Sequence, residues 1–195
     1  NLIKHRGPDD SGWFYHKQVS LGHVRLSIQD TSKLAHQPFL SKDGKMVLIF
    51  NGEIYNHWEI RKVLENNGIV FRSRSDTETI LEGYLIYGNK IFEMLNGIFS
   101  ICLYDLLNEK IVLVRDRFGV KPLYYSYNSK TFQFSSELKT INFDPLQLDH
   151  ATISNYIKFL WSPGVGTPSK QIRKMLPGEI CTVTQENGSI KKISE

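Results

Sequence analysis

The sequence predicts an α+β fold in which most strands are antiparallel. Short runs of β-branched and aromatic residues, separated by turn residues, follow one another over residues 97–135. Two segments with helical spacing of apolar residues precede them, at 56–67 and 75–87. Helices grouped between runs of strands favour an α+β fold over a regularly alternating α/β fold. Successive hairpins favour an antiparallel sheet.

The N-terminal half contains four of the expected elements. The segment His5–Gly12 before them is rich in turn residues and predicts a loop. The second helix has an N-cap at Ser75 or Asp76, with Glu78 in its first turn. The four elements are an alternating strand over residues 19–28, a buried strand over 45–51, a helix over 56–67 and a helix that ends at Gly88.

The C-terminal half continues with hairpins and one helix. No internal repeat or low-complexity linker interrupts it, so one domain is expected over residues 1–195. The expected elements are a short helix over 90–95, strands over 97–105, 110–115, 123–127 and 131–135, a helix over 151–160, a strand over 179–184 and an Asn187-Gly188 turn.

Composition is that of a soluble globular protein. The chain has 195 residues, of which 41% are hydrophobic and 23% charged, and its net charge of +4 is scattered along the sequence. This distribution does not favour a nucleic-acid partner. No apolar run approaches the roughly 20 residues that span a bilayer, so no membrane association is expected. Cys102 and Cys181 lie far apart, which favours a reducing compartment, most simply the cytoplasm.

Several chemical motifs are absent from the sequence or point to structure. The histidines lack HxH or HExxH spacing, and no metal site is expected. Cys102 lies among apolar residues and is expected in the core, and Cys181 lies in the expected terminal strand with no histidine close to it in sequence. Asp116 and Arg117 indicate an ion-paired turn. The chain has no SGGxDS pyrophosphate loop for ATP.

Five residues next to apolar runs have the functional groups that bind a zwitterionic amino acid. Arg25 could bind an α-carboxylate through its planar guanidinium. Glu53 and Asp76 could bind the α-ammonium group. The side chain of Asn51 beside the N–H of Gly52 could form an oxyanion hole.

Each residue also has an ordinary structural interpretation. An arginine in a strand is often an exposed ion-pair partner. Asp76 could serve only as a helix cap, and Asn51-Gly52 is a common turn pair. Each residue alone is weak evidence for a binding site, and only the five together favour one.

Seven motifs occur in order along the chain, and a further LPGE follows at Leu176–Glu179. The seven motifs are HRGPDDSG at His5–Gly12, LGHVRLSI at Leu21–Ile28, FNGEIYN at Phe50–Asn56, SDTE at Ser75–Glu78, LNGIFSICLYD at Leu95–Asp105, RDRFGVKPLYY at Arg115–Tyr125 and FSSELK at Phe134–Lys139. In order and spacing they resemble the motifs of glutamine-hydrolysing asparagine synthetases. The resemblance covers essentially the whole chain and is to the class II glutamine amidotransferase domain, or glutaminase domain, of that family. It implies an N-terminal-nucleophile hydrolase fold, a four-layer αββα sandwich of two antiparallel sheets.

The resemblance implies a role for each matching position in the binding of L-glutamine. Asn51 and Gly52 would form the oxyanion hole, and Glu53 and Asp76 would hold the amino group. Arg25 would bind the α-carboxylate in a pocket lined by backbone groups of Leu26, Ser27, Ile28 and Gln29.

The resemblance also implies parts that this sequence does not contain. The nucleophile of the family is the N-terminal cysteine of the mature chain, with its own α-amino group as base, and is expected upstream of residue 1 on a further strand. A synthetase domain that uses ATP and Mg²⁺ to activate aspartate and accepts the ammonia is expected after residue 195. This domain itself is expected to need no cofactor and, alone, to be inactive; a homodimer is usual for bacterial members.

Two other functions compete with this interpretation. A related amidotransferase could deliver the ammonia to another carboxylate, since the acceptor is chosen outside these motifs. A module without a nucleophile could instead dock a synthetase partner as a scaffold.

Overall fold

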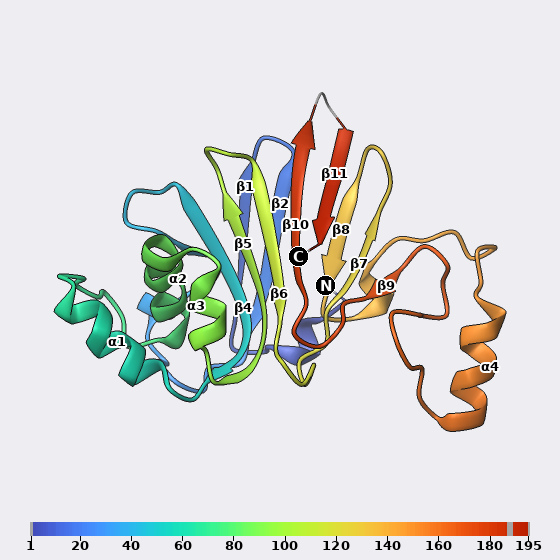
Figure 1. Ribbon diagram of the computed structural model, residues 1–195, viewed down its shortest axis with the longest axis horizontal. Helices are drawn as coiled ribbons and strands as arrows, with labels where there is room; N and C mark the ends of the chain where they lie inside the picture. The colour runs from blue at the N-terminus through green and yellow to red at the C-terminus, as the bar shows by residue number, and fades with distance from the viewer. Residues whose placement is uncertain (1, 187–188, 195) are drawn as a thin grey trace.

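The computed structural model describes residues 2–186 and 189–194 (Figure 1). Short 3-10 helices cover Lys4–Arg6, Lys33–Ala35 and Leu138–Thr140. The α-helices are α1 His57–Asn66, α2 Asp76–Tyr87, α3 Lys90–Met94 and α4 His150–Phe159. The strands are β1 Asp10–His16, β2 Val19–Arg25, β3 Phe39–Leu40, β4 Met46–Ile54, β5 Gly97–Asp105, β6 Lys110–Arg115, β7 Tyr124–Tyr127, β8 Phe132–Ser135, β9 Arg173–Lys174, β10 Ile180–Glu186 and β11 Ser189–Ser194.

A six-stranded antiparallel sheet, in the order β11-β10-β6-β5-β4-β3, forms the centre of the fold. Successive side chains of β5 alternate between two hydrophobic clusters. Ile101 and Leu103 pack on the side of the helices, and Cys102 and Tyr104 pack on the opposite side. Because both faces are buried, strands such as β4 have nearly continuous apolar sequences.

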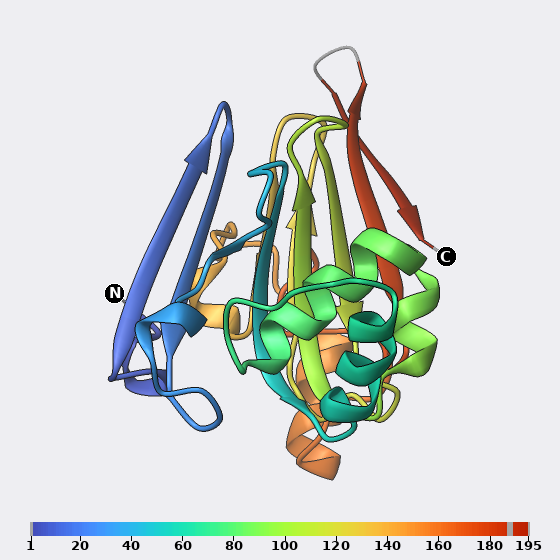
Figure 2. The same ribbon diagram turned by 90° about the vertical axis from the view of Figure 1, so that its left-hand side faces the viewer.

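Helices α1, α2 and α3 cover one face of this sheet (Figures 1 and 2). Ile80 and Leu81 of α2 are fully buried in the cluster between helices and sheet. The N-cap of α2 is Ser75, whose hydroxyl accepts the N–H of Glu78 at 3.3 Å. Asp76, the other candidate cap, is therefore the first helical residue.

The opposite face is covered by the β1-β2 hairpin and by the small sheet β8-β7-β9. Leu21 of β2 and Tyr125 of β7 join the second hydrophobic cluster there. Figure 1 shows α1–α3, the central sheet, the small sheet β8-β7-β9 and α4 following one another across the molecule, with the β1-β2 hairpin behind the central sheet. The α+β sandwich prediction is confirmed, although within the described residues the second sheet layer consists of two separately hydrogen-bonded pieces.

A groove separates these two pieces. β2 and β8 are edge strands of their sheets and line a cavity of about 350 Å³ between them. Tyr104, Ile111 and Val183 of the central sheet line it as well. The groove is thus open between two strand edges and has a largely apolar base.

The differences from the predicted elements are local. The prediction of a loop for His5–Gly12 is wrong at its end, because β1 begins at Asp10 and pairs along its whole length with β2. The strand predicted over residues 19–28 ends at Arg25. The Asn187-Gly188 turn lies outside the described residues. No helix in the described ranges is long and apolar enough to cross a membrane.

Candidate functional site

A cavity of about 480 Å³ lies where β2, β4 and β5 meet the segment that follows β8. Its size is within the range of about 300–1,000 Å³ typical of small-molecule sites. Eight of the nine predicted site residues line it: Arg25, Leu26, Ile28, Gln29, Asn51, Gly52, Glu53 and Asp76. Ser27 is not among its lining residues, and its backbone N–H binds the carboxylate of Asp9 at 2.8 Å.

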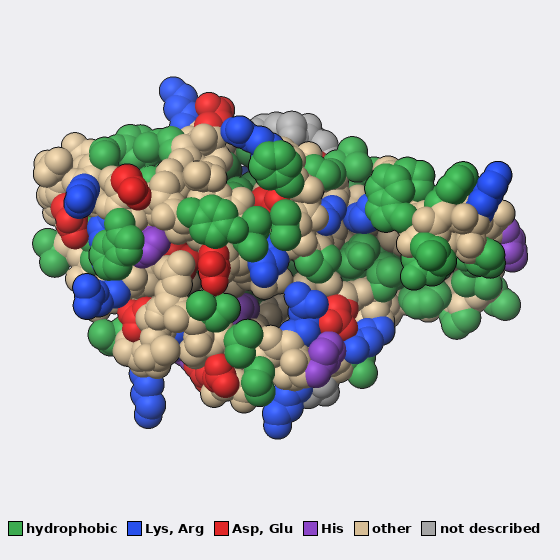
Figure 3. Space-filling model, turned by 90° about the horizontal axis from the view of Figure 1, so that it is seen from below, with side chains coloured by type: hydrophobic (Ala, Val, Ile, Leu, Met, Phe, Trp, Pro, Cys, Tyr) green, Lys and Arg blue, Asp and Glu red, His purple; other side chains and the backbone are tan. Residues whose placement is uncertain are grey.

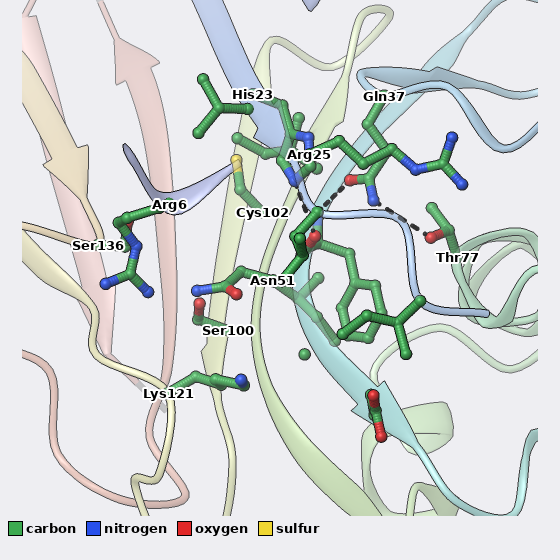
Figure 4. A pocket seen from close by; sticks show the side chains of 18 of the residues that line it. Arg6, His23, Arg25, Gln37, Asn51, Thr77, Ser100, Cys102, Lys121 and Ser136 are labelled. Carbon is green, nitrogen blue, oxygen red and sulfur yellow. Dashed lines mark hydrogen bonds between the residues drawn. The ribbon is translucent and has the colours of Figure 1, made fainter. Parts of the chain in front are cut away.

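Asn51 and Gly52 lie on β4 where it pairs with β5. Asn51 is the register partner of Ser100, and their side chains lie close together in Figure 4. A Cβ atom on Gly52 would lie 2.0 Å from the carbonyl oxygen of Ile98, so only glycine fits here. These residues belong to a paired strand, and the interpretation of Asn51-Gly52 as a turn is wrong.

Asp76 lies at the first turn of α2, opposite the end of β4. Its carboxylate accepts the N–H groups of Ile54 at 3.1 Å and Thr77 at 2.9 Å. Burial raises the pKa of this carboxyl to about 6, against the effect of the two N–H groups, and the negative charge of Glu53 adds to the rise. A pocket carboxylate with this pKa favours a cationic ligand, because a nearby positive charge compensates for the lost hydration.

Arg25 ends β2 and is buried at the pocket wall. Its guanidinium donates hydrogen bonds to the carbonyl oxygens of Asp30 and Ser32, the latter at 3.1 Å. It is not an exposed ion-pair partner, and that interpretation is wrong. Figure 4 shows the guanidinium directed away from the side chain of Asn51, so the two groups lie at different ends of the site.

Gln37 is a buried pocket residue that the sequence interpretation missed. Its side-chain oxygen accepts the N–H of Phe50 at 2.7 Å, and its side-chain nitrogen donates to the hydroxyl of Thr77 at 3.3 Å (Figure 4). One amide therefore ties the strand that carries Asn51 to the helix turn that carries Asp76. The sequence signal was only the Gln37-Pro38 pair, whose peptide bond is cis.

His23 and Cys102 lie side by side in the lining (Figure 4) but are poor candidates for chemistry. Burial lowers the pKa of His23 to about 4, so its imidazole is neutral near pH 7 and donates to the carbonyl of Phe50 at 3.1 Å. Burial raises the pKa of the Cys102 thiol, which keeps it protonated and unreactive. The location of Cys102 in the core is confirmed.

Arg6 and Lys121 bring further positive charge to the side of the pocket opposite Arg25 (Figure 4). Arg6 forms an ion pair with Glu137 at 3.3 Å. Lys121 follows the turn at Asp116, whose fully buried carboxylate accepts the backbone N–H groups of Phe99, Phe118, Val120 and Lys121 at 3.0–3.2 Å. The expected Asp116-Arg117 ion pair is wrong, because this carboxylate binds backbone groups.

The pocket therefore separates opposite charges around a polar centre. Glu53 and Asp76 form an acidic wall where β4 meets α2, while Arg25, Arg6 and Lys121 supply cations around the rest. Asn51 and Ser100 lie between Arg25 on one side and Arg6 and Lys121 on the other (Figure 4). This arrangement matches an amino acid with an amide or acid side chain.

Comparison with known proteins identifies the class. The family profile of the glutamine amidotransferase domain matches residues 1–193, and the chain belongs to this family.

Its relatives among known proteins are longer enzymes named asparagine synthetases. Over 184 residues, the chain is 35% identical to asparagine synthetase [glutamine-hydrolyzing] 1 of Bacillus subtilis, covering 93% of this chain and 29% of that protein. It is 43% identical over 143 residues to a probable asparagine synthetase [glutamine-hydrolyzing] of Schizosaccharomyces pombe. This alignment covers 72% of this chain and 25% of that protein. The chain thus spans less than a third of the length of these relatives.

The fold is also found in a solved amidotransferase. The glutamine phosphoribosylpyrophosphate amidotransferase of B. subtilis, solved with ADP and GMP, superposes with a TM-score of 0.61 at 20% identity. The alignment covers 90% of this chain and 34% of that one. At this identity the similarity establishes the fold alone, and it agrees with the predicted N-terminal-nucleophile hydrolase architecture.

Proposed function

We propose that this domain hydrolyses L-glutamine to glutamate and ammonia. In this proposal, a synthetase portion of the same polypeptide uses the ammonia in the ATP-dependent conversion of aspartate to asparagine. The observation that carries the proposal is the gathering of Arg25, Asn51, Gly52, Glu53 and Asp76 around one cavity. Membership of the glutamine amidotransferase domain family and similarity to asparagine synthetases support it.

The charges of the pocket suggest how glutamine would lie. The α-ammonium would bind the acidic wall formed by Glu53 and Asp76. The α-carboxylate would bind Arg25, whose guanidinium has five N–H donors, so some remain beyond those bound to the carbonyls of Asp30 and Ser32. The side-chain carboxamide would then reach Asn51 and Gly52, which would stabilise the oxyanion of the tetrahedral intermediate.

The nucleophile in this proposal is an N-terminal cysteine carried by residues that precede the present chain. Its sulfur attacks the carboxamide carbon, and its α-amino group transfers the thiol proton to the leaving nitrogen. Ammonia departs and a γ-glutamyl thioester remains. Water then hydrolyses the thioester, which restores the thiol and releases glutamate. Cys102 and Cys181 are both buried, which argues against either as a substitute.

The groove between β2 and β8 offers a place for the strand that would carry this cysteine. Its two sides are strand edges, and its base is apolar. An extended segment paired with both edges would join the two smaller sheets into one and satisfy their backbone groups.

The experiment that tests the proposal uses the full-length protein. We expect hydrolysis of glutamine and covalent labelling by 6-diazo-5-oxo-norleucine at the N-terminal cysteine. The double variant Cys102→Ala, Cys181→Ala is the matched control and should keep both properties. A folded full-length protein that neither hydrolyses glutamine nor takes up the label would refute the proposal. If the label appeared at Cys102, the assignment of the nucleophile would be wrong.

Two alternatives have distinct outcomes in the same assay. An amidotransferase with another acceptor would hydrolyse glutamine without forming asparagine from aspartate and ATP. A scaffold would bind a synthetase without hydrolysing glutamine. In the present proposal ATP and Mg²⁺ act in the synthetase portion, and the steps above need no cofactor. Cys102 and Cys181 form no disulfide, which is consistent with a reducing compartment such as the cytoplasm.

A further inference from the structure

Helix α4 presents an unusual surface for a helix of a folded domain. Of its ten residues, only Thr152 is buried. The helix and the two residues after it expose a cluster of large apolar side chains, which we name the α4 surface. It consists of Tyr156, Ile157, Phe159, Leu160 and Trp161.

The exposure is largest at the C-terminal turn of the helix. Ile157 is 73% exposed, Leu160 81% and Trp161 61%. Ile157 lies in the last turn of the helix, and Leu160 and Trp161 follow its end at Phe159, so the three side chains lie close together along the chain. Clusters of exposed apolar residues of this kind mark interaction sites, and aromatic residues are enriched at the centres of interfaces. A ten-residue helix is also shorter than the about 12–15 residues at which isolated helices become even marginally stable, so covering it would stabilise it.

The backbone at Leu160 gives an independent reason to assign a role to this surface. Leu160 ends α4 in the left-handed conformation, with φ of 55° and ψ of 20°. Glycine or asparagine is preferred at such a position, because a side chain with a branched or bulky body is strained there. The sequence has instead an exposed leucine, which local stability alone does not favour.

The position of the α4 surface indicates its partner. Figure 3 shows the face onto which the pocket opens, with a hollow near the centre and hydrophobic side chains gathered at the right-hand end, over α4. Ammonia released from the pocket must be kept from water until it reaches its acceptor. A folded domain that covered this face would contact the α4 surface and would also close the mouth of the pocket.

We propose that the α4 surface docks the synthetase portion of the same polypeptide, an inference that rests on the proposed function. The relatives are more than three times the length of the aligned part. Each of them therefore has a further portion large enough to cover this face. Intramolecular docking needs no high intrinsic affinity, because the linkage supplies a high effective concentration. The shared face favours this partner over a second copy of the chain.

The test compares variants of the full-length protein. Ile157→Asp places a charge in the centre of the surface, and Leu160→Asn removes apolar area while easing the backbone. Tyr15→Asp on β1 is the matched control, because Tyr15 is 69% exposed and lies outside the pocket lining and the α4 surface. Hydrogen exchange of α4 amides, glutamine hydrolysis, ammonia-dependent synthesis and glutamine-dependent synthesis are measured for each.

In the wild-type protein we expect protected α4 amides. Ile157→Asp and Leu160→Asn should lower this protection about tenfold, the loss typical of removing one central interface residue. Glutamine hydrolysis and ammonia-dependent synthesis should persist, while the product formed per glutamine hydrolysed falls. Because Leu160→Asn suits the left-handed backbone, its Tm should not fall, which excludes unfolding as the cause.

Three outcomes decide between the possibilities. Rapid exchange of α4 in the wild-type protein, or unchanged coupling in both variants, overturns the proposal. Sedimentation that shows a dimer converted to monomer by Ile157→Asp, with coupling intact, also overturns it and identifies a second copy as the partner. If glutamine is never hydrolysed but α4 is protected in a monomer and exposed by Ile157→Asp, the docking is supported and only the proposed function fails.

Discussion

Helices α2 and α4 begin in the same way and end in opposite environments. Each has a side-chain cap: Ser75 accepts the N–H of Glu78 at 3.3 Å, and Asp149 accepts the N–H of Thr152 at 3.0 Å. Nine of the twelve residues of α2 are buried, against one of ten in α4. Local capping therefore defines where a helix starts, whereas its surroundings determine what its side chains do. α2 serves the pocket and the core, and α4 offers a surface.

Of the changes that test the difference between α2 and α4, we expect the largest effect from substitution of Glu78 in α2. Its fully buried carboxylate accepts the N–H groups of Arg72 at 2.9 Å and Ser73 at 2.6 Å, and the Ser73 hydroxyl at 2.7 Å. Glu78→Ala leaves these donors without a partner, and we expect the free energy of unfolding to fall by about 3–5 kcal/mol. Urea denaturation measures this. Glu78→Gln, which keeps one acceptor oxygen, should lose less; an equal loss would contradict the hydrogen-bond explanation.

Substitution of Asn51, which lines the same pocket as Asp76 of α2, should affect catalysis and not stability. In the full-length protein, Asn51→Ala should lower kcat for glutamine hydrolysis about 10²–10³-fold, because one donor to the oxyanion is lost. KM should change little. Steady-state kinetics provide the measurement. A variant with normal kcat and a raised KM would show that Asn51 contributes to binding only.

A matched pair of truncations measures the difference in burial directly. Leu81→Ala in α2 should lower the free energy of unfolding by about 3 kcal/mol, since it leaves a cavity in the core. Ile157→Ala in α4 should change it by less than about 0.5 kcal/mol if the measurement follows the domain alone. Comparable losses in isolated-domain denaturation would mean that α4 is covered within this domain.

The smallest effect that we expect is a pH dependence of kcat/KM and of stability. It should arise from Asp76 at the start of α2, and α4 should not contribute to it. Because burial raises the pKa of Asp76 from its ordinary 3.8 to about 6, the carboxyl is protonated below pH 6 and cannot attract an ammonium group. Below this pH, kcat/KM for glutamine should fall by up to about tenfold per unit, while the α-ammonium group of the substrate stays charged. Ionisation of Asp76 also costs folding free energy, so its contribution to stability is lost as the pH rises through about 6.

Asp76→Asn provides the comparison for this pH profile. It should weaken binding at pH 7 and remove the step near pH 6. If the step remained in this variant, another group would be responsible.

Much of this molecule could be predicted from local patterns. The apolar runs of β4 and β5 and the spacing of α1 and α2 predicted their elements, because both depend on short-range periodicity. The set of Arg25, Asn51, Gly52, Glu53 and Asp76 was predicted as one binding site, and the structure places all five around one cavity. Their individual roles stay predictions.

What could not be predicted depends on contacts between distant residues. Gln37 gave no signal as a pocket residue, because its partners Phe50 and Thr77 are brought to it by tertiary structure. Ser100 joins the site only through the register of β4 and β5. β1 was missed since its first residues also form a turn motif, and pairing with β2 outweighs that local preference. The exposure of α4 was equally invisible, as helical spacing does not reveal which neighbours exist.

The turn at Asp116 has a consequence for protein engineering. Its carboxylate binds only main-chain N–H groups, and Gly119 supplies the positive φ of 64° that the turn needs. The guanidinium of Arg115 also donates to the carbonyl oxygens of Gly119 at 2.6 Å and Lys121 at 2.8 Å. The shape of the turn therefore depends on Arg115, Asp116 and Gly119, and not on the side chains at the three positions 118, 120 and 121. A library randomised at those three positions, with the other three residues kept, would sample new pocket charges and new rim surfaces on an unchanged backbone.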